Sequence, residues 1–256
     1  MAATLCFDAT EYRPGTHHPL HQHDCLHLSL VLRGCVAEAV GSVTEYAGAL
    51  SVVAKDAGVI HADHFGPGGA KLARLTLPFG TTASLVDDPR RGPSWRWTHD
   101  PAVARPFLRL VRRARAGVRS FDSDDQDLVD VLAALTARPA SGARGRPPAW
   151  LEQTMSDLRE SWRPDRTVRD VASSAGVHPV YLARSVRRWY GIGVGEEMRR
   201  LRFRRAVAAL AETTATVSKV AHESGFSDEA HLCRSFRQYL DITPRHYRGL
   251  LGDFGS

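Results

Sequence analysis

The sequence predicts a multi-domain α+β protein with a β-rich N-terminal half and an all-α C-terminal half. Three observations predict this fold class. Short alternating runs of apolar and polar residues occupy residues 1 to about 80, helical patterns dominate from Trp150 onwards, and the stretch RPASGARGRPPA at 138–149 separates the two. A chain of 256 residues is long enough for two domains, each with its own core.

The clearest strand pattern is LHLSLVLRG, residues 26–34. Leucines occupy every second position from Leu26 to Leu32, so they share one face of an extended chain, and His27 and Ser29 lie on the other face. The runs VAEAVGSVTEY, GALSVVA and AKLARLTLPF follow and are broken by Gly and Pro. Short strands at close spacing favour a β-sandwich or a small β-barrel.

Two helices are expected to follow the strands. Residues 81–98, which end in the aromatic sequence WRW, are first expected to be irregular. Asp100 has the character of an N-cap with Pro101 in the first turn, which predicts a helix up to about residue 116. A second helix is expected over about 124–137. Its apolar stripe consists of Leu128, Val131, Leu132 and Leu135.

The C-terminal half is expected to contain seven helices. Thr167 and Thr216 have the character of N-caps, and Gly176 and Gly225 that of residues with positive φ at sharp turns. The expected helices are at about 150–161, 168–175, 179–190, 195–211, 217–224, 228–239 and 244–251.

An internal repeat organises these helices. TVRDVASSAGVHPVYLARSVRRWYGI begins at Thr167, and TVSKVAHESGFSDEAHLCRSFRQYLDI begins at Thr216, an offset of 49 residues. One extra residue follows the second glycine, so the later matches, such as Arg184 with Arg234, are 50 apart. Helix, glycine turn and a second helix rich in arginine form the pattern of a helix-turn-helix, at about 167–190 and 216–240.

The second helix of such a unit fits the major groove of double-stranded DNA, and its early exposed residues meet the bases. Arg184 and Arg234 occupy equivalent outward positions and are the strongest candidates for base or phosphate contact. The spacing puts Leu182, Val186, Leu232 and Phe236 on the buried side. The candidate DNA-contacting residues are His178, Pro179, Val180, Ala183, Arg184, Arg187, Arg188, Ser227, Asp228, Glu229, Ala230, His231, Cys233, Arg234 and Arg237.

The segment GFSDEAHLCRSFRQYLDITPRHYR, which begins at Gly225, resembles the signature of the AraC/XylS family of bacterial transcription regulators. Leu232 replaces the usual Phe and Asp241 the usual Gly. The resemblance covers about residues 150–250, and it implies a seven-helix module whose two helix-turn-helix units enter successive major grooves. It also implies RNA polymerase as a partner if the protein is an activator. The residues at the start of the second helix differ between the two helix-turn-helix units. We therefore expect the units to bind different half-sites, which predicts an asymmetric operator.

Histidines gather in the N-terminal half. GTHHPLHQHDCLHLSLVLRG, from Gly15 to Gly34, resembles the first cupin motif, with His27 where that family has Glu. Regulators of the AraC type commonly carry a cupin-like sensor domain, so both resemblances imply one architecture, with a small-molecule effector. Imidazole ligands favour Zn, Ni or Cu over Mn. The candidate ligands of such a divalent transition metal are His21, His23, His27 and His61.

These observations predict a cupin-like effector-sensing or metal-sensing domain at 1–137, which is also the candidate dimerisation domain, a linker at 138–149 and a DNA-binding domain at 150–251. We therefore expect a one-component transcription regulator and not an enzyme. Two alternatives are a cupin-type metalloenzyme fused to a DNA-binding domain, and an effector-independent DNA-binding homodimer. The apolar stripe beginning at Leu128 either forms a dimer face or packs on its own domain.

Bulk composition is compatible with this interpretation. The formal net charge is +6, and only three of the 34 basic residues are lysines. The chain has no apolar run of the roughly 18 residues that a membrane span needs and no pattern of a signal peptide, so no membrane partner and a cytoplasmic location are expected. The four scattered cysteines are expected to be free thiols.

Overall fold

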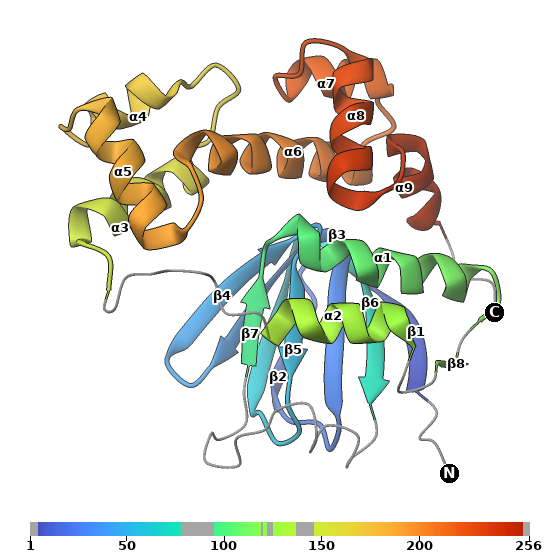
Figure 1. The fold of residues 1–256 in the computed structure, drawn as a ribbon. Helices are drawn as coiled ribbons and strands as arrows, with labels where there is room; N and C mark the ends of the chain where they lie inside the picture. The colour runs from blue at the N-terminus through green and yellow to red at the C-terminus, as the bar shows by residue number, and fades with distance from the viewer. Residues whose placement is uncertain (1–4, 78–94, 119, 122–124, 137–145, 253–256) are drawn as a thin grey trace. The chain divides into compact units, whose positions relative to one another are not determined.

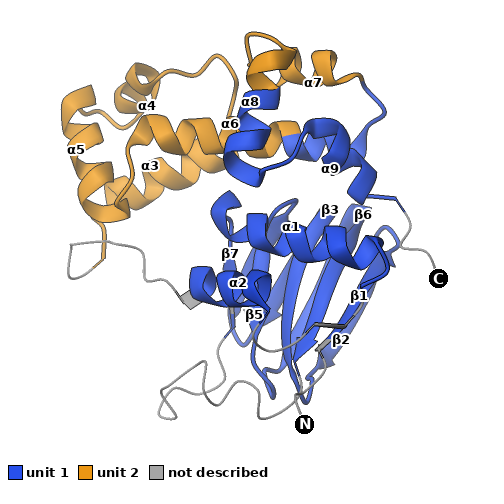
Figure 2. Ribbon diagram, turned by 45° about the vertical axis from the view of Figure 1, so that its right-hand side comes forward, with its two compact units in different colours: residues 1–136, 207–215, 233–256 blue, residues 137–206, 216–232 orange. Residues whose placement is uncertain are grey.

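The computed structural model describes residues 5–77, 95–118, 120–121, 125–136 and 146–252 (Figure 1). The chain forms two compact units (Figure 2). Unit 1 comprises residues 1–136, 207–215 and 233–256, and unit 2 comprises residues 137–206 and 216–232. The expected division of the chain is confirmed, because the N-terminal half is rich in strands and the C-terminal half is helical.

Eight strands of unit 1 form one sheet. They are β1 (Leu5–Tyr12), β2 (His17–His21), β3 (Leu26–Val40), β4 (Val43–Gly48), β5 (Val52–Lys55), β6 (His61–Leu77), β7 (Trp95–Thr98) and β8 (Ser120–Phe121). The main order is β7-β5-β3-β6-β1-β8, with β2 also paired to β6 and β4 to β3. Every pairing is antiparallel. Within the described ranges no ladder joins β7 to β8, so the sheet is open there.

The long strand β3 changes face along its length. Val31 pairs with Leu72 of β6 and Arg33 with Lys71, so Leu32 is the extra residue of a β-bulge. Because side chains alternate along a strand, one extra residue moves the later positions to the opposite face. Ser29 before the bulge and Glu38 after it therefore line the same cavity, although their numbers differ in parity.

Strand β7 corrects the expectation that residues 81–98 are irregular throughout. Trp95 pairs with Lys55 of β5 and Trp97 with Val53, so residues 95–98 are a strand. The part of the expected segment before Trp95 lies outside the described residues. A four-residue strand is too short for its alternation to stand out in the sequence, and pairing with β5 stabilises it.

Helices α1 (Pro101–Arg115) and α2 (Gln126–Thr136) lie side by side across one face of the sheet (Figures 1 and 2). Asp100 caps α1 by accepting a hydrogen bond from the Ala102 amide at 2.9 Å, as its position predicts. The ends of the second expected helix, Asp124 and Ala137, lie outside the described residues. The stripe of α2 is mostly buried within its own unit: Leu128, Val131 and Leu132 are at most 9% exposed and Leu135 is half-buried. The stripe therefore packs within the protomer and is not a free dimer face.

The seven expected C-terminal helices are all present, and their ends fall within a residue or two of the expected ones. They are α3 (Ala149–Glu160), α4 (Val168–Ser174), α5 (Pro179–Tyr190), α6 (Val194–Glu212), α7 (Val217–Glu223), α8 (Glu229–Leu240) and α9 (Pro244–Leu250). Most of the linker proposed at 138–149 lies outside the described residues.

Local signals determine where these helices begin and end. The Thr167 hydroxyl accepts from the Asp170 amide, and the Asp170 carboxylate accepts from the Thr167 amide, which completes a capping box for α4. Thr216 caps α7 in the same way by accepting from the Lys219 amide at 3.2 Å. Gly176 and Gly225 have φ of 66° and 82°, as the turns require.

Unit 1 also contains α9. Its Tyr247 is fully buried, and its hydroxyl donates to the carbonyl oxygen of Leu32, the bulge residue, at 2.6 Å. The Lys71 ammonium donates to the carbonyl oxygens of Leu251 and Gly252 at 3.0 and 2.9 Å, just beyond the end of α9. These bonds satisfy carbonyl groups that a bulge and a helix end leave without interstrand or intrahelical partners.

All four cysteines are free thiols, as expected. A search of the described helices finds none that is both long enough and apolar enough to cross a membrane.

Candidate functional site

The first recognition helix is α5. Its N-cap is His178, whose imidazole Nδ1 accepts from the Val180 amide at 3.3 Å. Leu182 and Val186 are fully buried, and they join α5 to a core built from α3, α4 and α6. The opposite side of α5 faces solvent, because Arg184 is exposed there.

The second recognition helix is α8, and an acidic residue holds its start. The Asp228 Oδ1 accepts from the His231 amide at 2.6 Å, and the Ser227 hydroxyl donates to Asp228 Oδ2 at 3.2 Å. Asp228 thus ties the start of the helix, which gives a physical reason for an acidic side chain beside a candidate DNA surface. Leu232 and Phe236 are fully buried, as their spacing predicts.

The structure places the predicted DNA-contacting residues at or near the surface. The exposed ones are His178, Val180, Arg184, Arg187, Arg188, Ser227, Asp228, Ala230, Arg234 and Arg237. Partly buried are Pro179, Ala183, Glu229, His231 and Cys233. None of the five arginines forms an ion pair with a described carboxylate, so their guanidinium groups remain available for phosphate or base edges.

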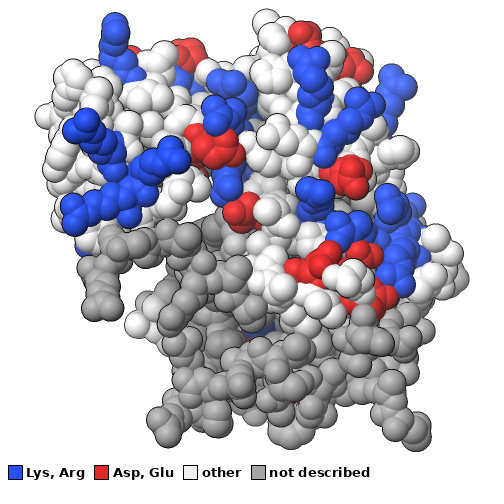
Figure 3. Space-filling view, in the orientation of Figure 1, with Lys and Arg blue, Asp and Glu red and all other residues white. Residues whose placement is uncertain are grey.

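Basic side chains project from the helical part of the chain with acidic ones between them (Figure 3). Tyr181 is a further candidate that was not predicted from the sequence: it is 54% exposed at the start of α5 and stacks on Trp150 with ring centroids 5.5 Å apart. The sequence did contain a signal for Tyr181, because this residue directly follows Val180, which was already a candidate DNA-contacting residue. An apolar pair at this point suits contact with thymine methyl groups.

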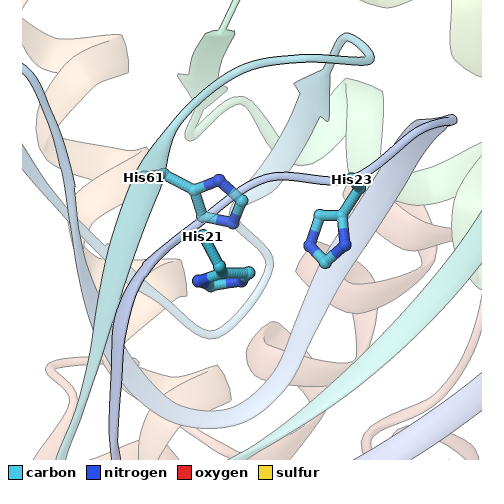
Figure 4. A group of neighbouring side chains, drawn as sticks. All are labelled: His21, His23 and His61. Carbon is cyan, nitrogen blue, oxygen red and sulfur yellow. The ribbon is translucent and has the colours of Figure 1, made fainter.

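A histidine cluster lies in unit 1. His21 ends β2, His23 lies in the loop that follows, and His61 begins β6 (Figure 4). Each of the three offers one nitrogen, and these three atoms all lie within 4.8 Å of one another. The close approach follows from the β2–β6 ladder, in which His21 and His61 are direct partners.

Backbone carbonyls fix the orientation of two of the rings. The Nδ1 of His21 lies 2.8 Å from the Pro19 carbonyl oxygen, and the Nδ1 of His61 lies 2.9 Å from that of Val59. A nitrogen bonded to a carbonyl must carry the proton, so Nε2 of each ring has a free lone pair. The His61 Nε2 is buried and has no hydrogen-bond partner among the described residues.

The surroundings favour the neutral form of three imidazoles of the cavity, those of His23, His27 and His61. Burial lowers the pKa of His23 and of His61 to about 4 and that of His27 to about 3, with nearby positive groups acting in the same direction. The bond from His61 to the Val59 carbonyl opposes this shift and is the weaker influence. Neutral rings carry the lone pairs that metal ligation and hydrogen-bond acceptance require.

His27 lies beside the cluster rather than in it. Its ring stacks on that of His23 with centroids 4.2 Å apart, and it lines the same cavity. No described grouping of close ligand atoms includes it. Two carboxylates lie close to these histidines: Asp63 groups with His18 and His21, and Glu38 groups with His61 and Asp63.

The cavity beside the cluster has a volume of about 370 Å³. Its most buried charge is Glu38, which is 1% exposed, pairs with Lys55 and accepts from Trp97 Nε1 at 2.6 Å and from Trp95 Nε1. Sequence reasoning missed Glu38, although a lone carboxylate inside the apolar run VAEAV was a usable signal. A buried ion pair of this kind is expected in a protein interior only when its charged groups also have hydrogen-bond partners.

The fold and these sites define a class: a DNA-binding protein with two helix-turn-helix units and an antiparallel sheet that carries a histidine-lined cavity. A family model described as a helix-turn-helix domain matches residues 171–249. The HTH-type transcriptional regulator GlxA of Rhizobium meliloti is 32% identical over 221 residues, which cover 70% of this chain and 67% of that protein.

Two shorter matches lie in the same class. The regulatory protein PocR of Salmonella typhimurium is 31% identical over 84 residues, 33% of this chain and 28% of that protein. A putative AraC-like transcription regulator of Streptomyces lividans is 34% identical over 92 residues, 36% of this chain and 29% of that protein. The chain thus spans under a third of the length of these two relatives. The chain belongs to the AraC family of transcriptional regulators, a family of regulators and not of enzymes.

Proposed function

We propose that this protein is a one-component regulator in which a ligand or metal in the histidine-lined cavity controls how α5 and α8 bind double-stranded DNA. The observation that carries this proposal is the convergence of His21, His23 and His61 in a domain that accompanies the DNA-reading helices. A ligand changes DNA binding only if it favours one state of the protein over another. Whether that change activates or represses transcription decides whether RNA polymerase is a partner.

The domain boundaries belong to the same proposal. We place a cupin-like sensor at 1–137, a linker at 138–149 and the DNA-binding domain at 150–251. Support for a cupin-like sensor comes from the histidine motif between Gly15 and Gly34 and from the antiparallel sheet that carries it. A cytoplasmic location fits a protein that must reach DNA.

The donor set fits a divalent transition metal. His21, His23 and His61 would hold it, with Asp63 at hand, because its Oδ2 lies 3.9 Å from the Nε2 of His21 and of His61. Backbone carbonyls orient two of the three rings, which is the supporting arrangement usual behind histidine ligands. A ligand set of three imidazole nitrogens favours Zn, Ni or Cu. A bound cation would also satisfy the buried His61 Nε2.

Metal content tests this part directly. The full chain, dialysed and then titrated with Zn or Ni, should bind about one ion per chain by mass spectrometry and calorimetry. His61→Ala should lose that binding, because it removes a buried ligand. The matched control is His64→Ala, since His64 is exposed on the same strand and belongs to none of the close ligand groups. A chain that ignores both added metals would refute the metal site.

Genomic footprinting with and without candidate effectors tests the regulatory role. The bound sites should be asymmetric, because the tip of α5 presents Val180 and that of α8 presents Glu229. Effector-independent binding by a homodimer is the competing function. Footprints that never respond to an effector or metal, together with a strictly dimeric chain in gel filtration, would favour that alternative.

A further inference from the structure

We propose that the cavity beside the histidine cluster binds a small carboxylate with an apolar or aromatic body, and that Arg74 holds its carboxylate group. This inference names the ligand class of the effector site and so rests on the proposed function. It concerns a residue that neither the histidine cluster nor the DNA-reading helices use.

The two carboxylates of the cavity lie next to groups other than Arg74. Glu38 pairs with Lys55, and the two tryptophan N–H groups complete the shell of that carboxylate. Asp63 lies 3.8 to 3.9 Å from nitrogens of His18, His21 and His61. Neither carboxylate is within ion-pair distance of Arg74.

Arg74 lines the cavity, and its ladder partner on β1, Asp8, accepts a hydrogen bond from the Thr10 hydroxyl and forms no ion pair with Arg74. One of its amino groups donates to the Tyr12 hydroxyl at 2.8 Å, and it forms no ion pair with any described carboxylate. A guanidinium group has five N–H donors, and the phenol takes one. A half-buried cation among apolar groups is stabilised by an anion, and the planar guanidinium fits a carboxylate with two parallel hydrogen bonds.

The remaining walls fit an apolar body. The Tyr12 ring stacks on Phe65 with centroids 3.9 Å apart and an angle of 6° between the planes. Val36, Val53, Leu72 and Trp97 line the same cavity. Its volume of about 370 Å³ is at the small end of ligand sites, which run from roughly 300 to 1,000 Å³. A small aromatic or short aliphatic acid is of the right size.

The sheet also places Arg74 close to the histidines. Arg74 is the ladder partner of Ser29 on β3, and the next residue on the same face, Thr76, is the partner of His27. A carboxylate held by Arg74 therefore lies beside His27, within the cavity that His21 and His23 line. One ligand can contact the guanidinium and approach the cluster without leaving the cavity.

The test is a panel of benzoate, phenylacetate, indole-3-acetate and octanoate, each compared with its own primary amide. Binding to the full chain, with and without Zn, is followed by calorimetry and by tryptophan fluorescence. At least one acid should bind about tenfold or more tightly than its amide. Arg74→Gln should abolish that preference, and Arg74→Lys should retain part of it. Arg105→Gln, an exposed arginine on α1, should leave it unchanged.

Either of two results would overturn the inference. In the first, the wild type binds no acid more tightly than its amide; in the second, the Arg74→Gln chain binds the acids with the same affinity as the wild type. Zn and DNA binding by the same Arg74→Gln chain separate this outcome from failure of the proposed function. If acids bind through Arg74 and DNA binding never responds, the carboxylate site stands and the effector role is wrong.

Discussion

The Nδ1 of His61 lies 2.9 Å from the carbonyl oxygen of Val59, and that single contact determines what the rest of the ring can do. The proton must lie on Nδ1, so the lone pair lies on Nε2, which is buried without a hydrogen-bond partner in the described part of the chain. A buried polar atom without a partner is costly. A ligand or metal bound at Nε2, as we propose, would remove that cost.

The pair Gly176 and Gly225 gives a stability prediction from the internal repeat. Both have positive φ, so alanine at either place should destabilise the fold by about 1–2 kcal/mol from backbone strain. A Cβ at Gly176 meets nothing within 4 Å, whereas one at Gly225 would lie 2.6 Å from the Cβ of Pro164. Gly225→Ala should therefore cost about 1–3 kcal/mol more. Urea unfolding checks this, and equal effects would contradict the packing described around Pro164.

The buried ion pair between Glu38 and Lys55 gives a second prediction about stability. Lys55→Met leaves the Glu38 carboxylate buried without its cation and should reduce the free energy of unfolding by about 3–5 kcal/mol. Glu38→Gln added to Lys55→Met removes the stranded charge and keeps an acceptor for Trp97, so the double variant should be more stable than the single one by at least about 1 kcal/mol. A double variant no more stable than Lys55→Met would show that the pair is not coupled as described.

Stability of the metal-free chain should fall in mild acid. Burial lowers the pKa of His23 and His61 to about 4 and that of His27 to about 3, whereas in the unfolded chain these groups titrate near about 6.5. Between about pH 6.5 and pH 4 the unfolded chain binds more protons than the folded one, so the free energy of unfolding decreases as the pH falls.

Urea unfolding midpoints at about pH 7 and about pH 5 measure this effect, over a range in which most carboxylates stay ionised. His27→Gln should show a smaller fall than the wild type, because glutamine does not titrate. His64→Gln serves as the control, since His64 is exposed. An identical fall in all three chains would mean that His27 is not held neutral by burial.

DNA binding should depend on the two equivalent arginines. Arg184→Ala and Arg234→Ala should each weaken binding to the footprinted operator by about 1–3 kcal/mol. Arg105→Ala, on the sheet domain, should leave the affinity unchanged. Mobility shifts at fixed salt provide the measurement, because phosphate contacts respond strongly to ionic strength. Unchanged affinity for Arg184→Ala or Arg234→Ala would remove that residue from the DNA surface.

The C-terminal helices could be predicted closely because their signals are local. Thr167 and Thr216 cap helices within their own first turns, and Gly176 and Gly225 end them with a conformation that glycine favours. None of these features depends on a partner distant in the sequence, so periodicity and caps sufficed to locate them.

The cavity was less predictable because distant contacts build it. The bulge at Leu32 exchanges the two faces of β3, so simple alternation from His27 gives the wrong face for Glu38. Arg74 reaches the cavity only through the pairing of β6 with β3. The histidine motif indicated where the cavity lies, but its charge comes from Glu38, Lys55 and Arg74, which lie 4, 21 and 40 positions beyond Gly34, the last residue of that motif.

One measurement tests the central claim, control of DNA binding from the histidine cluster, most directly. The affinity of the full chain for its footprinted operator is measured by fluorescence anisotropy, in chelator and then with added Zn or Ni, for the wild type, His61→Ala and His64→Ala. The account predicts that metal changes the affinity of the wild type and of His64→Ala by about fivefold or more, and that His61→Ala does not respond. A wild-type affinity that is the same with and without metal, or a His61→Ala response equal to the wild type, would contradict it.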